Sequence, residues 1–131
     1  MEGSRAGNGG IRVLLADDDE PFVESLRPLI DHQPGLMVVG AAHDGLEALD
    51  LAERLHPDAV VIDLHMPLLD GVSAVTTLRG QDPVLCLIAL TGDDDPGLHR
   101  AVLDAGADAV LEKREFVDRL LAQLGNVRAR G

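Results

Sequence analysis

The chain has very few aromatic side chains: its 131 residues include two phenylalanines and no tryptophan or tyrosine. A buried core must therefore be built from Val, Leu, Ile and Ala. Cysteine is as scarce, since Cys86 stands alone. One cysteine cannot form an internal disulfide, and the apolar neighbours of Cys86 predict a small buried side chain.

Positive charge is also scarce, with 11 Lys and Arg residues against 23 Asp and Glu and a net charge of −12. Phosphate contacts require Lys and Arg, so this balance argues against direct binding of nucleic acid or of an anionic membrane. Only one of the basic residues is a lysine, Lys113. The acidic residues must serve another purpose.

Long apolar runs are missing as well. No stretch approaches the roughly 18 residues of a membrane span, and the polar, Gly-rich start does not resemble a signal peptide. We therefore expect a cytoplasmic protein. Residues 1–10 are predicted to be a disordered arm or tag, residues 11–125 one domain, and residues 126–131 a tail or the start of a linker.

Short apolar runs alternate with amphipathic stretches along the chain. The runs predict strands at 11–16, 36–40, 59–63, 84–90 and 109–111, and the helical spacing of apolar residues predicts helices at 22–30, 46–55, 72–78, 98–105 and 116–124. Asp95-Pro96 reads as a helix start, Gly106 and Gly125 as helix ends, and Pro28 predicts a kink in the first helix. The alternation predicts an α/β fold with a doubly wound, five-stranded parallel sheet of order 2-1-3-4-5.

Polar side chains stand where these apolar runs end. Asp17 and Asp18 follow the first strand, Asp63 ends the third, Thr91 follows the fourth and Lys113 lies just past the fifth. In a doubly wound sheet the carboxyl ends of strands 1 and 3 flank the point where ligands bind, so three carboxylates would meet there. Such a cluster requires positive charge, and Mg²⁺ is the hard cation that takes carboxylates, water and phosphate oxygens. Lys113 supplies a second, fixed positive charge.

From about residue 11 to residue 124 the sequence resembles the receiver domain of two-component response regulators, a flavodoxin-like fold. The resemblance is carried by four motifs in order: an acidic pair in 14–18, a phosphoacceptor segment in 63–71, Leu90-Thr91-Gly92, and Lys113. The segment 38–49 is most similar to the LuxR-like, DNA-binding regulators. That similarity implies a longer regulator that controls transcription through an output domain.

The resemblance implies a role for each matched residue. Asp63 accepts a phosphoryl group from a histidine kinase or phosphotransfer protein, and Thr91 and Lys113 hold the phosphoryl oxygens. Asp18, Asp63 and the backbone carbonyl of His65 bind Mg²⁺, with Asp17 acting mainly through metal-bound water. The domain catalyses only its own phosphorylation and dephosphorylation and is not otherwise an enzyme. Its output is a protein-interaction face, which also serves a homodimer, formed by the fourth helix, fifth strand and fifth helix.

The chain departs from the family pattern at two positions. Val110 stands three residues before Lys113, where an aromatic residue or His is usual, and Arg114 replaces a common proline. These departures keep a second function open: a receiver-like binding module that acts without phosphorylation.

A third function is a phosphatase of the haloacid dehalogenase type, which also forms an aspartyl phosphate. Asp17-Asp18-Asp19 fits the spacing of that family, with Asp17 as the phosphorylated residue. However, Pro21 stands where Thr or Val is usual, and Asp63 has no role in that scheme.

The remaining polar residues have simpler interpretations. We expect Asp19 and Asp70 to cap helices, Asp93-Asp94-Asp95 to be a solvated helix start, and the side chain of His65 to bind neither metal nor phosphate. Asp93, two residues after Thr91, and His65, two after Asp63, occupy positions where the family tunes loss of the phosphoryl group. The other histidines, His32, His43, His56 and His99, are expected at the solvated surface.

Overall fold

The structure, a computed structural model, describes residues 10–92, 95–113 and 116–125. The predictions for residues 1–9, for the tail at 126–131, for Asp93 and Asp94, and for Arg114 fall outside this part of the chain. The strands are β1 (Ile11–Ala16), β2 (Leu36–Ala42), β3 (Ala59–Asp63), β4 (Cys86–Thr91) and β5 (Ala109–Glu112). The helices are α2 (Glu20–Asp31), α3 (Gly45–Leu55), α4 (Gly71–Gln81), α5 (Pro96–Ala105) and α6 (Phe116–Gly125).

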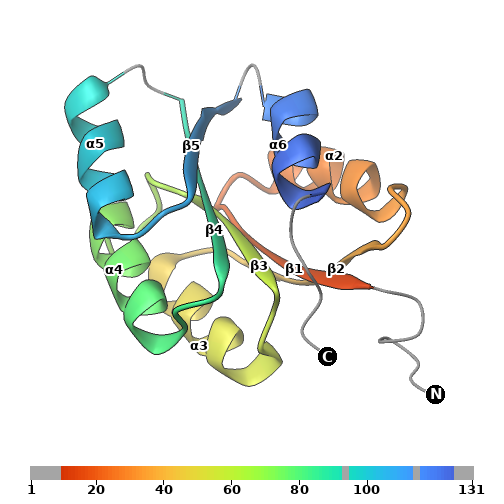
Figure 1. The fold of residues 1–131 in the computed structure, drawn as a ribbon, viewed down its shortest axis with the longest axis horizontal. Helices are drawn as coiled ribbons and strands as arrows, with labels where there is room; N and C mark the ends of the chain where they lie inside the picture. Colours follow the sequence, from red (N-terminus) through yellow and green to blue (C-terminus); the bar gives the residue numbers. More distant parts are fainter. Residues whose placement is uncertain (1–9, 93–94, 114–115, 126–131) are drawn as a thin grey trace.

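The strands form one sheet of order β2-β1-β3-β4-β5, and every neighbouring pair is parallel. Helices lie on both faces of this sheet (Figure 1). The predicted α/β fold and its strand order are thus confirmed. Because β1 and β3 are parallel neighbours, their carboxyl ends lie side by side. This is the switch point of a doubly wound sheet, where the direction of winding reverses.

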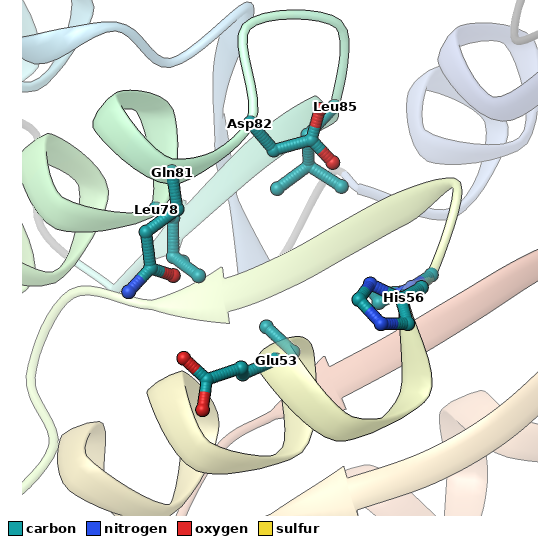
Figure 2. A pocket seen from close by; sticks show the side chains of 8 residues that line it. Glu53, His56, Leu78, Gln81, Asp82 and Leu85 are labelled. Atoms are coloured by element: carbon teal, nitrogen blue, oxygen red, sulfur yellow. The ribbon is translucent and has the colours of Figure 1, made fainter.

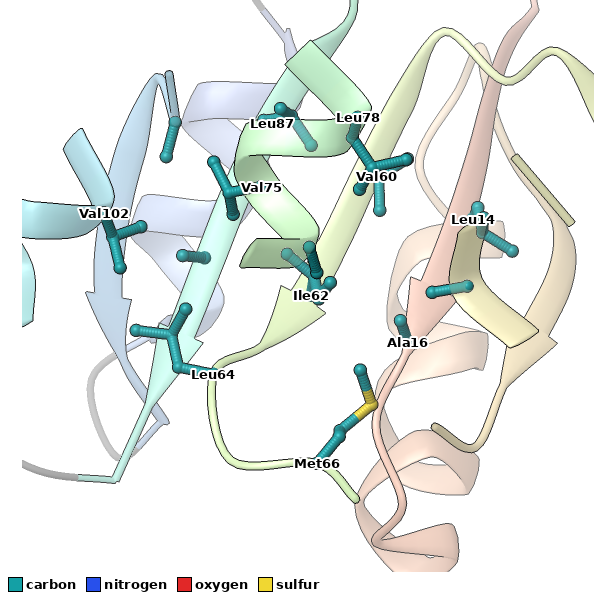
Figure 3. Packing of buried hydrophobic residues seen from close by; sticks show 14 of the residues in the cluster. Leu14, Ala16, Val60, Ile62, Leu64, Met66, Val75, Leu78, Leu87 and Val102 are labelled. Carbon is teal, nitrogen blue, oxygen red and sulfur yellow. The ribbon is translucent and has the colours of Figure 1, made fainter. Parts of the chain in front are cut away.

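Two apolar layers hold the helices to the sheet. On one face, Leu14, Val60 and Ile62 pack with side chains of α3, α4 and α5 (Figure 3). On the other face, residues of β1, β3, β4 and β5 pack with Val23, Leu26 and Ile30 of α2 and Leu124 of α6. The central strands β1, β3 and β4 read as nearly continuous apolar runs because they are buried on both faces, whereas the edge strands β2 and β5 are only partly buried.

The helix boundaries follow side-chain chemistry. Asp19, Asp70 and Asp95 are N-caps whose carboxylates accept hydrogen bonds from backbone N–H groups one turn into the helix, as predicted. Gly106 ends α5 with a φ of 124°, and a Cβ there would lie 2.6 Å from Arg79 Cγ. Glycine is required at this position both for the backbone angle and for the close approach of Arg79.

The predicted start of β4 was wrong. Val84 and Leu85 precede the strand, which begins at Cys86, and Val84 is 75% exposed. The Val84 N–H donates to Asp82 Oδ1 at 3.2 Å, and Arg79 Nη1 donates to the Pro83 carbonyl at 3.0 Å. These hydrogen bonds hold residues 82–84 in a turn, so Val84 and Leu85 do not join the sheet although they are apolar.

Pro28 lies within α2, where the helix continues to Asp31. Gly125 is the last residue of α6. Among the described helices, none combines the length and the apolar character needed to cross a membrane.

Candidate functional site

The alternation of side chains along β1, β3 and β5 brings three charged groups to one face of the sheet. Leu15, Val61 and Leu111 all belong to the layer under α2 and α6. Side chains two residues apart in a strand share a face, so the residues two positions further on, Asp17, Asp63 and Lys113, emerge on that same face at the carboxyl end. The ends of three apolar strands thus place their charged side chains in one cluster.

Lys113 bridges the two buried carboxylates of this cluster. Its Nζ lies 2.8 Å from Asp17 Oδ2 and 3.4 Å from Asp63 Oδ2. Asp17 and Asp63 are only 2% and 4% exposed. A charge buried to this degree is costly unless it is paired, and one ammonium serves both carboxylates.

Asp18 adds a third carboxylate from the exposed side. One oxygen of each of Asp17, Asp18 and Asp63 lies within 4.8 Å of the others. Within residues 10–92, 95–113 and 116–125, this is the one group of three such side chains close enough to share a metal ion. The donors are all oxygen and carry three negative charges, a set suited to a hard divalent cation such as Mg²⁺.

The pKa of Asp63 is raised above its ordinary value of 3.8, first by burial and then by the negative charge of Asp17. Lys113 and the His65 N–H, which donates to Asp63 Oδ1 at 3.3 Å, oppose this rise. Burial also acts to lower the pKa of Lys113, but its contacts with Asp17 and Asp63 outweigh burial and raise it. The cationic form of Lys113 is therefore favoured by the fold, whereas the ionised form of Asp63 is disfavoured.

Thr91 ends β4 next to this cluster and is completely buried. Asp63 is paired in register with Leu90, and the Leu64 N–H donates to the Leu90 carbonyl at 2.9 Å. Thr91 therefore lies one residue beyond the level of Asp63 on the neighbouring strand. His65 is exposed in the loop after β3.

Sequence reasoning missed Phe22. The apolar spacing at 22–30 accounts for Phe22 only as a core residue of the first helix, and it does pack against the layer under α2. However, its ring also lies under the ammonium of Lys113, with Nζ 4.6 Å from the ring centroid. The signal that could have pointed to this pair is the rarity of both residue types, because Phe22 is one of two phenylalanines and Lys113 is the only lysine in the sequence.

A cavity of about 350 Å³ lies at the other end of the sheet (Figure 2). It is lined by Glu53, His56 and Pro57 ahead of β3 and by Gln81, Asp82 and Leu85 ahead of β4, together with Ala52 and Leu78. Because Asp63 is at the carboxyl end of β3 and Pro57 precedes its start, this cavity is separate from the acidic cluster.

Comparison with known proteins assigns the family. The family profile described as the response regulator receiver domain matches residues 13–125, most of the chain. This chain belongs to that family. Its members are signalling proteins of two-component systems, and receiver domains interact with histidine kinases or phosphotransfer proteins.

Curated relatives include the response regulator MprA of Mycobacterium tuberculosis, which is 41% identical over 114 residues. That alignment covers 87% of this chain and 49% of MprA. MprA of Mycobacterium sp. strain KMS gives the same identity and coverage. The chain thus spans about half the length of the curated relatives it matches.

Solved structures confirm the receiver fold. The response regulator domain of Thermotoga maritima CheB superposes with a TM-score of 0.81 at 30% identity and covers 88% of this chain and 94% of the CheB chain. A LuxR-family response regulator from Aurantimonas sp. SI85-9A1 gives a TM-score of 0.80 at 30% identity, covering 92% of this chain and 89% of that one. The NarL receiver of Mycobacterium tuberculosis gives 0.80 at 27% identity, covering 89% and 98%.

Proposed function

We propose that this receiver domain accepts a phosphoryl group on Asp63 from a histidine kinase or phosphotransfer protein. The observation that carries the proposal is the placement of Asp63. Its buried carboxylate contacts Lys113 and shares a cluster of oxygens with Asp17 and Asp18 at the carboxyl edge of the sheet. The family match at residues 13–125 supports the same assignment.

In the proposed reaction an Asp63 carboxylate oxygen attacks phosphorus, and the bond from phosphorus to the donor atom breaks as the new P–O bond forms. The product is an acyl phosphate, and the donor leaves with the bonding electron pair. Phosphoryl transfer depends on in-line positioning and on charge stabilisation. Lys113 neutralises negative charge on the phosphoryl oxygens, and the Thr91 hydroxyl donates a hydrogen bond to one of them.

The carboxylates of Asp17, Asp18 and Asp63 and the backbone carbonyl of His65 are proposed to hold Mg²⁺. The fit rests on the all-oxygen donor set and on the excess of negative charge, since three carboxylates face a single ammonium. When bound, Mg²⁺ supplies charge neutralisation for the attacking and transferred oxygens. Asp17, already paired with Lys113, contributes mainly through metal-bound water.

The proposed output is a change in the face formed by α5, β5 and α6, which is also the proposed homodimer face. Phosphorylation favours one of two existing conformations of that face by adding charge beside Thr91 and Lys113. In the LuxR-like scheme, this cytoplasmic receiver controls transcription through an attached DNA-binding domain. The similarity to LuxR-family structures supports the scheme, whereas the closer MprA relatives are described simply as response regulators.

A second candidate is a receiver-like module that binds its partner without phosphorylation. The favouring observation is Val110, which is half-buried and packs against the apolar layer under α3, α4 and α5. Valine at this position has no ring that could rotate with Thr91.

The deciding experiment incubates the protein with Mg²⁺ and a small-molecule phosphodonor, then locates any added phosphoryl group by intact-mass and peptide mass spectrometry. We expect Mg²⁺-dependent labelling of Asp63, none in Asp63→Asn, and slower labelling without a shape change in Lys113→Ala. Labelling of Asp17 instead indicates the phosphatase chemistry. Full labelling of Asp63→Asn at another carboxylate contradicts the assignment.

The two receiver functions are separated by partner affinity and oligomeric state, measured before and after labelling. If Asp63 is labelled and neither property changes, the phosphorylation-independent module is favoured. The same conclusion follows if Mg²⁺ binds and Asp63 is not labelled.

A further inference from the structure

The ring of Phe22 covers the ammonium of Lys113. The distance of 4.6 Å from Nζ to the ring centroid lies within the range of a cation–π contact, in which the negative face of the ring attracts the cation. The same ammonium also forms ion pairs with the carboxylates of Asp17 and Asp63. The ammonium is thus held between two carboxylates and an aromatic face.

Helix α2 fixes the ring in this position. Phe22 lies in the first turn of α2, and its backbone N–H donates to the N-cap carboxylate of Asp19 at 3.2 Å. Its half-buried ring packs against the apolar layer shared by α2 and the sheet. Backbone and ring are therefore both constrained, whereas a lysine side chain on its own is long and flexible.

The three contacts of Lys113 respond differently to phosphorylation. The charge and position of the Asp63 oxygens change when a phosphoryl group is attached, and Asp17 takes part in the proposed metal site. The ring carries no titratable group and binds no metal, so its attraction for the ammonium persists through these changes. A contact that also shields the ammonium from water strengthens its interaction with the phosphoryl oxygens.

We propose that Phe22 is a positioning residue for Lys113, holding the ammonium at the point where it meets the phosphoryl group of Asp63. The contact links the start of α2 to the end of β5, two segments at opposite ends of the sequence. The proposal rests on the proposed function of Asp63, but the ring contact itself is testable without phosphorylation.

The first test reads the contact directly. Reductive methylation with ¹³C-formaldehyde labels Lys113 and the N-terminal amine and keeps the positive charge of the lysine. Two dimethylamine signals are expected in the NMR spectrum, and the one absent from Lys113→Arg belongs to Lys113. We expect this signal to be shifted upfield by the Phe22 ring, to lose the shift in Phe22→Leu, and to regain it in Phe22→Trp.

The second test measures the labelling rate of Asp63 at saturating phosphodonor and Mg²⁺. Phe22→Leu keeps the apolar contact with the core but removes the ring face, and we expect a loss of about three- to tenfold, the factor that corresponds to an ordinary cation–π contact. Phe22→Trp should restore the rate, since indole binds cations best. In the Lys113→Ala background, Phe22→Leu should change nothing further.

Leu29→Ala, at a 41% exposed position of the same helix, is the matched control and should leave both readouts unchanged. Thermal unfolding of each variant separates a loss of positioning from a loss of folding. The proposal is overturned if the Lys113 signal is the same in wild type and Phe22→Leu, or if Phe22→Leu slows labelling equally with and without Lys113. If wild type is not labelled at Asp63, the proposed function fails, and the NMR signal still decides whether the ring holds the ammonium.

Discussion

Lys113 forms its shorter ion pair with Asp17 rather than with Asp63, at 2.8 Å against 3.4 Å. Asp17 is the more deeply buried of the two carboxylates. Before any phosphoryl group arrives, the lysine is therefore paired most closely with the buried carboxylate of Asp17. The charged groups of the site therefore contribute to the stability of the fold.

Replacing Lys113 with Ala should lower the free energy of unfolding by about 2–4 kcal/mol, because it leaves buried carboxylates without their cation. Mg²⁺ should restore part of this loss by binding the same oxygens, so the variant should gain more stability from Mg²⁺ than wild type does. Urea unfolding followed by circular dichroism, in EDTA and in Mg²⁺, measures both effects. Lys113→Arg, which keeps the charge, is the control, and an unchanged midpoint for Lys113→Ala would contradict the burial argument.

Replacing Asp63 with Asn should raise stability at neutral pH in EDTA, by on the order of 1 kcal/mol. The pKa of Asp63 is raised in the folded protein, so its ionised form opposes folding above that folded pKa, and the penalty disappears as the carboxyl is protonated at lower pH. The advantage of Asp63→Asn should therefore be largest near pH 7 and shrink toward pH 4. A wild-type protein that is the more stable of the two at pH 7 would contradict this.

Replacing Arg79 with Ala should destabilise the end of the sheet opposite the acidic cluster, by about 2–3 kcal/mol. Its guanidinium donates to the carbonyls of Gly106, Asp82 and Pro83 and forms an ion pair with Asp108 at 3.1 Å.

The matched control for Arg79 is Arg54→Ala. Arg54 forms a solvent-exposed ion pair with Asp50 at 3.0 Å. Its replacement should lower the free energy of unfolding by less than about 1 kcal/mol. Equal losses for the two variants, measured by urea unfolding, would show that Arg79 does not bind the turn as described.

Cys86 should react slowly in the native protein. Burial, together with the charge of Asp108, raises the pKa of its thiol to about 11, so very little thiolate exists at pH 8. Alkylation by iodoacetamide, followed by intact-mass spectrometry, should be slow without denaturant and fast in concentrated urea. Fast native alkylation at pH 8 would show that the thiol is more accessible than its position at the start of β4 indicates.

The fold and most of the site could be predicted because they depend on local patterns. Apolar runs and helical spacing gave the elements, and acidic or basic residues at the ends of those runs gave Asp17, Asp18, Asp63 and Lys113 as neighbours. Parallel strands align their carboxyl ends, so residues far apart in the sequence need no further information to meet.

The features that escaped prediction depend on tertiary contacts. Val84 and Leu85 read as strand residues, but the turn before β4 is set by Arg79, whose partners include a carbonyl at the end of α5. Likewise, the position of Phe22 in an apolar stripe is visible in the sequence, whereas its contact with Lys113 depends on how α2 packs across the end of β5. Neither the contacts of Arg79 with the turn nor the contact of Phe22 with Lys113 can be predicted from the spacing of residues along the chain.

The position of β5 at the edge of the sheet has a consequence for the charge balance of the acidic cluster. The strands that lead to Asp17 and to Asp63 pair directly with each other, while the lysine follows a short strand at the outer edge of the sheet. Until that strand docks, the two carboxylates face each other without the lysine, so their ion pairs with Lys113 form only when β5 joins β4. Docking of this edge strand and pairing of the two buried carboxylates with their lysine are therefore coupled.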